Sequence, residues 1–257
     1  MLTISPSIRP LLADLRMALD PAALFRAAVG APDDWQTAML RLPARQLILN
    51  CSRQSGKSTT TAVLALHSAL YHPGALILIL APSQRQAVEL YRKVKGFAAA
   101  MGVPSQAVER QTGLTLELAG GARIVALPGK EQTIRGFSAV SLLIVDEAAR
   151  VPDDLYHAIR PMLAVSQGRI ALLSTPFGQR GFFYEAWRSS ADWQRFEVPA
   201  SACPRIDPAF LAAERQALGD WWYRQEYECR FSDTNDQIFS TLDIQAAVAP
   251  DLAPAFW

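Results

Sequence analysis

The stretch LNCSRQSGKSTTTAVLALH, residues 49–67, decides the fold that we expect for this chain. It passes from the end of an apolar segment, through small and polar residues, into a segment with the composition of a helix. Gly56, Lys57 and Ser58 match the end of the phosphate-binding loop pattern, which asks for Gly, four residues and Gly-Lys-Ser/Thr between a strand and a helix. Cys51 stands where the pattern begins with Gly. Because that position ends the strand, before the tightest part of the turn, we expect a small side chain to be tolerated and the loop to function.

Each part of this loop has a chemical role in holding a nucleotide. The backbone N–H groups of the loop and the helix N-terminus, equivalent to roughly half a positive charge, attract phosphate oxygens. Gly56 lets the backbone approach closely, Lys57 would reach the β- and γ-phosphates of ATP, and Ser58 would ligate Mg²⁺. An ordinary strand, loop and helix with an exposed lysine is the alternative. The residues expected to contact ATP here are Ser52, Arg53, Gln54, Ser55, Gly56, Lys57, Ser58 and Thr59.

Further polar residues follow two later apolar segments. In LLIVDEAA, Asp146 and Glu147 end a predicted strand, where phosphate-loop enzymes place carboxylates. We expect Asp146 to hold Mg²⁺ and Glu147 to orient and polarise the attacking water; a solvated acidic loop is the alternative. In ALLSTPFG, Ser174 and Thr175 could sense the γ-phosphate, although Ser-Thr-Pro is also an ordinary strand exit. A glutamate directly after the aspartate favours the ATPases that have an additional strand between the two motif strands.

Apolar segments alternate with helical patterns along the chain, which predicts a mainly parallel sheet covered by helices on both faces. This is the α/β architecture of phosphate-loop (P-loop) NTPases of the RecA-like, ASCE type. We also expect a small helical lid, from the N-terminus or from residues 207–230. The expected strands are 45–50, 75–81, 141–148 and 168–175, with a hairpin around Gly120-Gly121, and the expected helices are 8–28, 33–40, 56–71, 83–97 (capped by Ser83), 153–160, 182–189 and 207–230.

Composition limits the classes of protein that the chain can represent. Half of the 257 residues are hydrophobic and 19% are charged, so a core can form and disorder is not expected. The net charge of +1 gives no general attraction to nucleic acid. The three cysteines match no zinc-site spacing and indicate reduced thiols. MLTISPSIRP lacks the features of a signal peptide, and PGALILILAP is too short to cross a bilayer, so we expect no membrane contact.

Taken in order, these segments resemble the ATPase domain of the large terminase subunit, the motor that packs DNA into the capsids of tailed phages. The resemblance covers about Gln36 to Phe239 and rests on SRQSGKS as the phosphate loop, LLIVDEAA as the Walker B strand and LLSTPFG as the coupling motif. WQTAML resembles the upstream glutamine element, which implies that Gln36 reads the adenine edge. APSQRQA resembles the segment after the second strand. The resemblance implies ATP and Mg²⁺ as ligands.

Two arginines are candidates for the finger that stabilises the transferred phosphoryl group. IRGFSAVSLLIVDEA carries Arg135 shortly before the Walker B strand, where the family has a candidate arginine that acts on the ATP of a neighbouring subunit. A surface salt bridge is the alternative role of Arg135. Arg53, inside the loop, would act within its own subunit. An arginine finger raises the rate of phosphoryl transfer by roughly 10³- to 10⁵-fold. A finger at Arg135 would require a ring of subunits, whereas one at Arg53 would not.

The resemblance also implies a division into domains and a set of partners. We expect residues 1–232 to form the ATPase domain, with 1–44 supplying N-terminal helices and the adenine-side element. Residues 233–257 are expected to be a linker toward a nuclease domain that is missing, so we expect no nuclease activity. The implied partners are double-stranded DNA, bound without regard to sequence, further copies in a ring at the portal, and the small terminase subunit, in the cytoplasm of the bacterial host cell.

The function and the DNA-binding surface are left with alternatives. The segment RQAVELYRKVKG gathers Arg85, Arg92, Lys93 and Lys95, but on a helix these spread over more than one face, so a solvated surface is the alternative to a DNA contact. The leading function is ATP-driven translocation of double-stranded DNA. A helicase or remodelling ATPase is the second, although helicases usually carry another RecA-like domain. The third is an assembly protein that binds ATP to stabilise a ring and turns over little.

Overall fold

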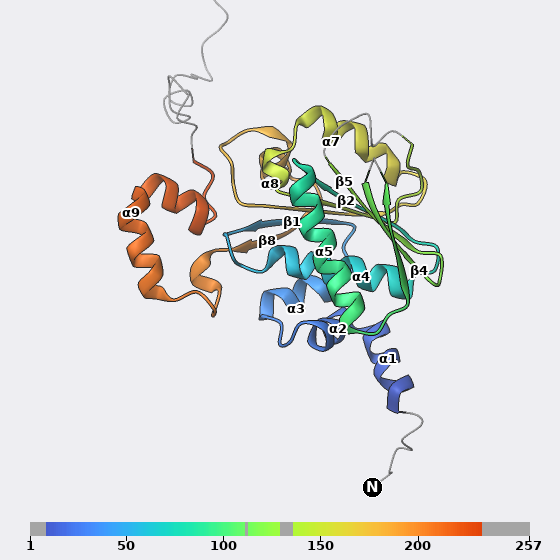
Figure 1. Ribbon diagram of the computed structural model, residues 1–257. Helices are drawn as coiled ribbons and strands as arrows, with labels where there is room; N and C mark the ends of the chain where they lie inside the picture. The colour runs from blue at the N-terminus through green and yellow to red at the C-terminus, as the bar shows by residue number, and fades with distance from the viewer. Residues whose placement is uncertain (1–8, 111–112, 129–135, 233–257) are drawn as a thin grey trace, which may run out of the picture.

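The centre of the molecule is a sheet to which eight strands contribute in the described part of the chain (Figure 1). The computed structural model describes residues 9–110, 113–128 and 136–232. The strands are β1 (Gln46–Cys51), β2 (Leu76–Ala81), β3 (Ser105–Arg110), β4 (Gly113–Leu118), β5 (Arg123–Pro128), β6 (Leu142–Asp146), β7 (Arg169–Ser174) and β8 (Gln194–Val198). They lie in the order β3-β4-β5-β2-β6-β7-β1-β8. Neighbours from β5 to β8 run parallel, whereas β4 pairs antiparallel with β3 and β5.

The strand that lies between the two motif strands is β7. It pairs with β1 on one side, where Asn50 is opposite Ser174, and with β6 on the other, where Asp146 is opposite Leu173. Because the three strands are parallel, their carboxyl ends meet at one edge of the sheet. The expectation of an additional strand between β1 and β6 is confirmed.

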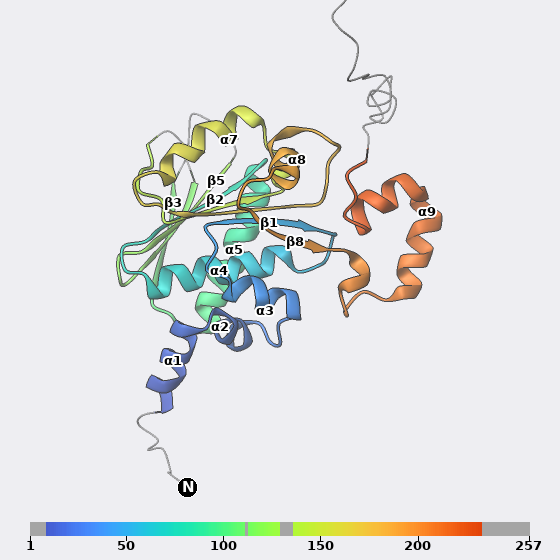
Figure 2. The same cartoon turned by 180° about the vertical axis from the view of Figure 1, so that it is seen from behind.

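Helices cover both faces of the sheet, as expected (Figures 1 and 2). On one face α4 (Lys57–Tyr71) and α5 (Gln84–Ala100) lie against the strands, and α1 (Arg9–Leu19), α2 (Pro21–Ala28) and α3 (Asp34–Arg41) pack outside α4. On the other face lie η1 (Ala148–Arg150), α7 (Asp153–Ile159), η2 (Arg160–Leu163) and α8 (Gly181–Arg188). Alternate strand residues supply the two cores: Leu47 and Leu49 belong to the first, and Ile48 to the second. This double burial explains why the strands are continuously apolar.

The last described helix stands apart from these two layers. After β8 and η3 (Ala200–Ala202) the chain forms α9 (Pro208–Tyr227), which lies beyond the β8 edge of the sheet (Figures 1 and 2). Gly219 interrupts α9 with φ 76° and ψ 161°, so two helical segments meet at a kink. The helical lid expected from the N-terminus or from residues 207–230 stays a prediction.

Several local expectations differ from the structure in detail. The helix expected at 8–28 is two helices, because Asp20 caps α2 by accepting a hydrogen bond from the Ala22 N–H at 3.0 Å, and Pro21 follows it. The hairpin at Gly120-Gly121 and the Ser83 cap of α5 are present. The edge strand β8 was not expected, since its side chains are mostly polar. Arg135 and the expected linker 233–257 lie outside the described residues, within which no helix is long and apolar enough to cross a bilayer.

Candidate nucleotide site

The phosphate loop connects β1 to α4, as the sequence predicts. Gly56 precedes the first residue of α4 and has φ 93° and ψ 10°, a left-handed conformation that glycine adopts at little cost. A Cβ atom at Gly56 would lie 2.8 Å from Nε2 of Gln36 and 3.5 Å from Nη2 of Arg205. The glycine of the motif is therefore needed both for the backbone conformation and for the close approach of two side chains.

Cys51 is a core residue rather than a loop residue. It ends β1, is fully buried and belongs to the apolar cluster on the α4 face of the sheet. Burial raises the pKa of its thiol well above the usual range, so the group stays neutral. The unusual first residue of the motif thus fills space under the loop, which answers how a side chain can stand at that position.

The catalytic candidates converge at the carboxyl ends of β1 and β6. Lys57 Nζ lies 3.6 Å from Oε1 of Glu147. Glu147 has φ 48°, which is unusual for a residue with a side chain and is the kind of local strain that clusters at active sites. Its N–H donates to Oδ1 of Asp146 at 3.0 Å. The lysine and two carboxylates therefore form one charged group at the sheet edge.

Asp146 is the buried member of this group. Burial, and then the neighbouring charge of Glu147, raise the pKa of Asp146 to about 6, while Lys57 opposes the shift. A divalent cation beside the carboxylate would favour its ionised form. Asp146 and the hydroxyl of Ser58 offer the oxygen ligands that Mg²⁺ prefers, so the residues present fit this ion. Within the described residues no group of three or more His, Cys, Asp or Glu side chains forms a separate metal site.

Ser174 and Thr175 lie between the two motif strands, at the end of β7. Both are buried, and the Ser174 hydroxyl has no hydrogen-bond partner among the described residues. A buried hydroxyl without a partner is costly unless a ligand or water supplies one. Its place beside the loop is suited to sensing a phosphate.

Gln36 reaches the loop from α3 and forms two side-chain hydrogen bonds within the chain. Its Oε1 accepts the Asp33 N–H at 2.8 Å, and its Nε2 donates to Oγ1 of Thr60 at 2.9 Å. The side chain is buried and forms a capping box with Asp33. The amide keeps a second N–H and a second acceptor lone pair for an adenine edge, and the role of Gln36 with the base stays a prediction.

Arg53 lies on a different side of the loop. Its guanidinium pairs with the buried carboxylate of Glu226. The backbone N–H of Arg53 donates to the backbone carbonyl of Glu226 at 3.2 Å. Nη2 of Arg150 lies 3.7 Å from the same carboxylate, and the Arg150 guanidinium lies 4.3 Å from the ring centre of Phe177 in the segment after β7. The end of α9 is thereby tied to the loop and to the segment after β6.

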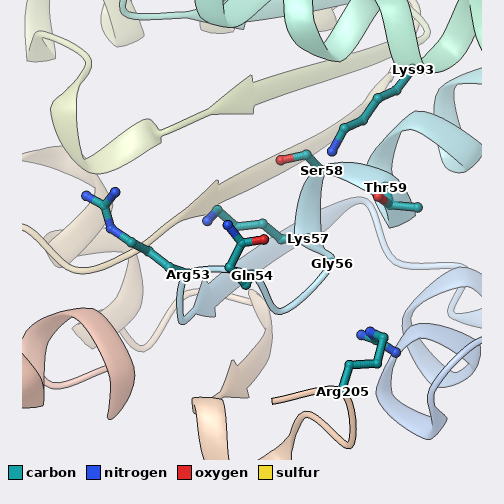
Figure 3. Close-up of a pocket in the computed structure, with 8 residues that line it drawn as sticks. All are labelled: Arg53, Gln54, Gly56, Lys57, Ser58, Thr59, Lys93 and Arg205. Atoms are coloured by element: carbon teal, nitrogen blue, oxygen red, sulfur yellow. The ribbon is translucent and has the colours of Figure 1, made fainter. Parts of the chain in front are cut away.

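Two residues of the cavity were not predicted there. A cavity of about 440 Å³ is lined by Arg53, Gln54, Gly56, Lys57, Ser58, Thr59, Lys93 and Arg205 (Figure 3). Lys93, from α5, was grouped with the cations of a possible DNA-binding helix, yet its side chain extends toward Ser58 (Figure 3). Arg85, Arg92 and Lys95 of that group are exposed on α5. Arg205 follows β8 and η3, and its sequence context gives no signal of a site.

Comparison with known proteins shows which family this chain resembles. The family described as terminase large subunit, T4likevirus-type, N-terminal, matches residues 48–246. The large terminase subunit of Thermus virus P23-45 is 28% identical over 88% of this chain and 54% of its own length, and that of Escherichia phage T5 is 26% identical over 78% and 47%. The chain thus spans about half the length of these relatives.

Solved structures show the same fold. The ATPase domain of the Thermus phage P74-26 large terminase has a TM-score of 0.68 and 24% identity, over 80% of this chain and 96% of that domain. The large terminase of bacteriophage HK97 has a TM-score of 0.67 and 16% identity, over 83% of this chain and 55% of its own. With the P-loop NTPase fold and a family match over most of its length, the chain belongs to the terminase large subunit family and corresponds to the N-terminal part of its members.

Proposed function

We propose that this chain binds ATP with Mg²⁺ at the β1–α4 loop and hydrolyses it to drive double-stranded DNA into a procapsid. The observation that supports this proposal above all is the convergence of Lys57, Asp146 and Glu147 at the loop, with Lys57 Nζ 3.6 Å from the Glu147 carboxylate. This is a minimal set for phosphoryl transfer to water: a cation for the phosphates, an oxygen ligand for the metal and a carboxylate to orient the nucleophile.

Each residue has a defined task in this proposal. The N–H groups of residues 52–58 and the amino end of α4 hold the phosphates, and Lys57 binds the β- and γ-phosphates. Mg²⁺, held by Ser58 and Asp146, supplies charge neutralisation of the transferred group. Glu147 orients and polarises the attacking water once Lys57 engages the phosphates. Ser174 and Thr175 detect loss of the γ-phosphate, and Gln36 and Thr59 lie toward the rest of the nucleotide.

The partners and setting are part of the same proposal. Relatives of this chain are large terminase subunits, so we propose that residues 1–232 act as the motor domain and 233–257 as a linker. The motor would work as a ring at the portal, with the small terminase subunit, in the cytoplasm of the bacterial host. Contacts with DNA would go to its backbone without base readout, and binding would weaken steeply with salt. ATP hydrolysis alone, and no nuclease reaction, is assigned to this chain.

The test measures ATP turnover per molecule at increasing protein concentration, with double-stranded DNA present. Wild type is compared with Lys57→Ala, Arg135→Ala and Arg53→Ala. Turnover per molecule that rises with concentration, and is lost in Lys57→Ala and Arg135→Ala, supports a ring with a finger supplied by the neighbour. A flat profile that depends on Lys57 and Arg53 supports a finger in the same subunit. Binding of ATP without turnover at any concentration would contradict the proposed motor and favour an assembly protein.

A further inference from the structure

Arg205 is held against the phosphate loop by three polar contacts. Its Nη1 and Nη2 atoms donate to the two carboxylate oxygens of Asp33 at 2.6 and 2.8 Å, and Nη2 also lies 3.3 Å from the Ser55 carbonyl oxygen. Asp33 is fixed in turn, since it caps α3 in the box that it forms with Gln36. The orientation of the guanidinium is therefore set by α3 and by the loop together.

This arrangement engages the edge of the guanidinium and balances its charge, while the side chain still lines the cavity. The Arg205 side chain is 51% exposed and lines the nucleotide cavity, whereas the Asp33 side chain is only 12% exposed. A bidentate carboxylate neutralises most of the field that a phosphate would feel. A planar, weakly hydrated guanidinium whose edge is engaged still stacks well on an aromatic surface.

Arg205 lies on the α3 side of the loop, beside Gly56 and the Ser55 carbonyl. Arg53 and Arg205 lie on opposite sides of the loop (Figure 3). Arg205 is next to Gly56 and to the Gln36 amide, whereas Arg53 faces Glu226 and the segment after β6. If Lys57 and Ser58 hold the phosphates at the start of α4, as proposed above, the base extends toward another wall of the cavity, and Arg205 forms one such wall.

We propose that the face of Arg205, oriented by Asp33, packs against the nucleobase of the bound nucleotide. This inference rests on the proposed function of the loop and adds a base-binding residue to it. Asp33 is a positioning residue in this scheme. Arginine stacking on an aromatic ring is favourable by roughly 0.5 to 2 kcal/mol, which corresponds to about a 2- to 30-fold change in affinity.

The experiment compares two ligands, ATP and inorganic tripolyphosphate, which carries the phosphates without a base. Calorimetric titration with Mg²⁺ gives the affinity of each for the wild type and for Arg205→Ala. We expect Arg205→Ala to weaken ATP binding about tenfold, with tripolyphosphate affinity unchanged within about twofold. Lys57→Ala should weaken both ligands. Arg205→Lys, which keeps the charge but lacks the planar face, should lose as much ATP affinity as Arg205→Ala.

A matched control is available on α3. Arg41 also forms a two-pronged pair with an aspartate, Asp20, and its side chain is likewise 51% exposed, but it does not line the cavity. Arg41→Ala removes a comparable ion pair and should leave both affinities unchanged. If it weakened ATP binding as much as Arg205→Ala, the effect of Arg205 would be one of general stability and the inference would be overturned.

The remaining outcomes separate the two proposals. An equal loss of ATP and tripolyphosphate affinity in Arg205→Ala would place the guanidinium on the phosphates and overturn the inference. Full ATP affinity in Arg205→Lys would do the same, because charge alone would suffice. Unchanged ATP affinity in Arg205→Ala would show that the base does not touch it. If the wild type bound neither ligand, the proposed nucleotide site itself would fail.

Discussion

Lys57 Nζ and the Oε1 atom of Glu147 lie 3.6 Å apart across the carboxyl ends of β1 and β6. The lysine comes from the first residue of α4 and the glutamate from the residue after β6. The same lysine also opposes the rise in the pKa of the buried Asp146. One side chain thus lies close enough to offset the charge of both carboxylates, the candidate metal ligand Asp146 and the candidate catalytic residue Glu147. Phosphates that engage Lys57 would free Glu147 to act on water.

This relationship predicts different effects for the two members of the pair. Glu147→Gln keeps the size and hydrogen bonding of the side chain but removes its charge, so ATP should still bind while turnover falls by roughly 10² to 10⁴. Lys57→Ala should lose ATP binding itself. Equilibrium binding and turnover are measured on the same samples. Glu185→Gln, on the exposed surface of α8, is the control, and wild-type turnover in Glu147→Gln would rule out the assigned role.

Replacing the loop glycine, Gly56, by alanine should lower stability and ATP affinity more than the same change at Gly74. Gly56→Ala introduces a side chain at φ 93° and within 2.8 Å of the Gln36 amide. Gly74→Ala meets a similar backbone strain at φ 71°, but nothing lies within 4 Å of its new atom. Backbone strain of this kind costs roughly 1 to 2 kcal/mol. Urea unfolding should show Gly56→Ala to be the less stable of the two, and it alone should lose ATP affinity. Equal stabilities would mean that the Gln36 contact gives way freely.

The burial of Cys51 predicts that its thiol is inert in the folded protein. All three cysteines are free and buried, and burial raises the pKa of Cys51. A variant that carries Cys203→Ala and Cys229→Ala keeps Cys51 as its one thiol. Reaction of this variant with a chromogenic disulfide reagent should be slow under native conditions and complete in denaturant. Rapid native labelling would show that the end of β1 opens, and that Cys51 belongs to the mobile part of the loop.

His67 predicts a dependence of stability on pH. It lies on α4, and its Nε2 atom is 3.1 and 3.2 Å from the carbonyl oxygens of Met17 and Ala18 on α1. Burial lowers the pKa of His67 below its usual value of 6.5. The folded state therefore binds this proton less readily than the unfolded state. The contribution of neutral His67 to the free energy of unfolding is fully present above pH 6.5 and is lost as the pH falls below that value.

The measurement for His67 is the free energy of unfolding between about pH 7 and pH 5. The wild type should lose stability on acidification more steeply than His67→Gln, whose amide can donate to both carbonyls without taking up a proton. His157→Gln, which changes an exposed histidine on α7, serves as the control. Parallel pH profiles for wild type and His67→Gln would show that the contact of α1 with α4 does not depend on the charge of this ring.

Much of the fold follows from patterns that are local in sequence. The buried strands were predicted because continuous apolar runs alternate with amphipathic helices, and the break between α1 and α2 was missed because the apolar spacing continues across Asp20-Pro21. The edge strand β8 was missed because only one of its side chains is buried. Its backbone pairs with β1 regardless of side-chain pattern, so hydropathy carried no signal.

Some residues around the loop could likewise be predicted from local sequence motifs, whereas others are brought there only by the fold. Lys57, Ser58, Asp146 and Glu147 lie in contiguous motifs whose spacing alone indicates their chemistry. Arg205 meets Asp33 across 172 positions in the sequence, and Arg53 meets Glu226 across 173. Lys93 looked like one cation among several on a helix surface, and only the packing of α5 beside α4 brings it to the cavity.

The sequence by itself determined the β1–loop–α4 unit, the acids after β6 and the two-faced parallel sheet, because backbone preference and the periodicity of burial are properties of neighbouring residues. The tertiary structure alone decided that Cys51 fills the core, that Glu226 engages Arg53 and that Arg205 forms a wall of the cavity beside the loop. These contacts join segments that return to the loop from distant parts of the chain. Where a segment returns depends on how the helices pack and how the strands are ordered, which no local pattern encodes.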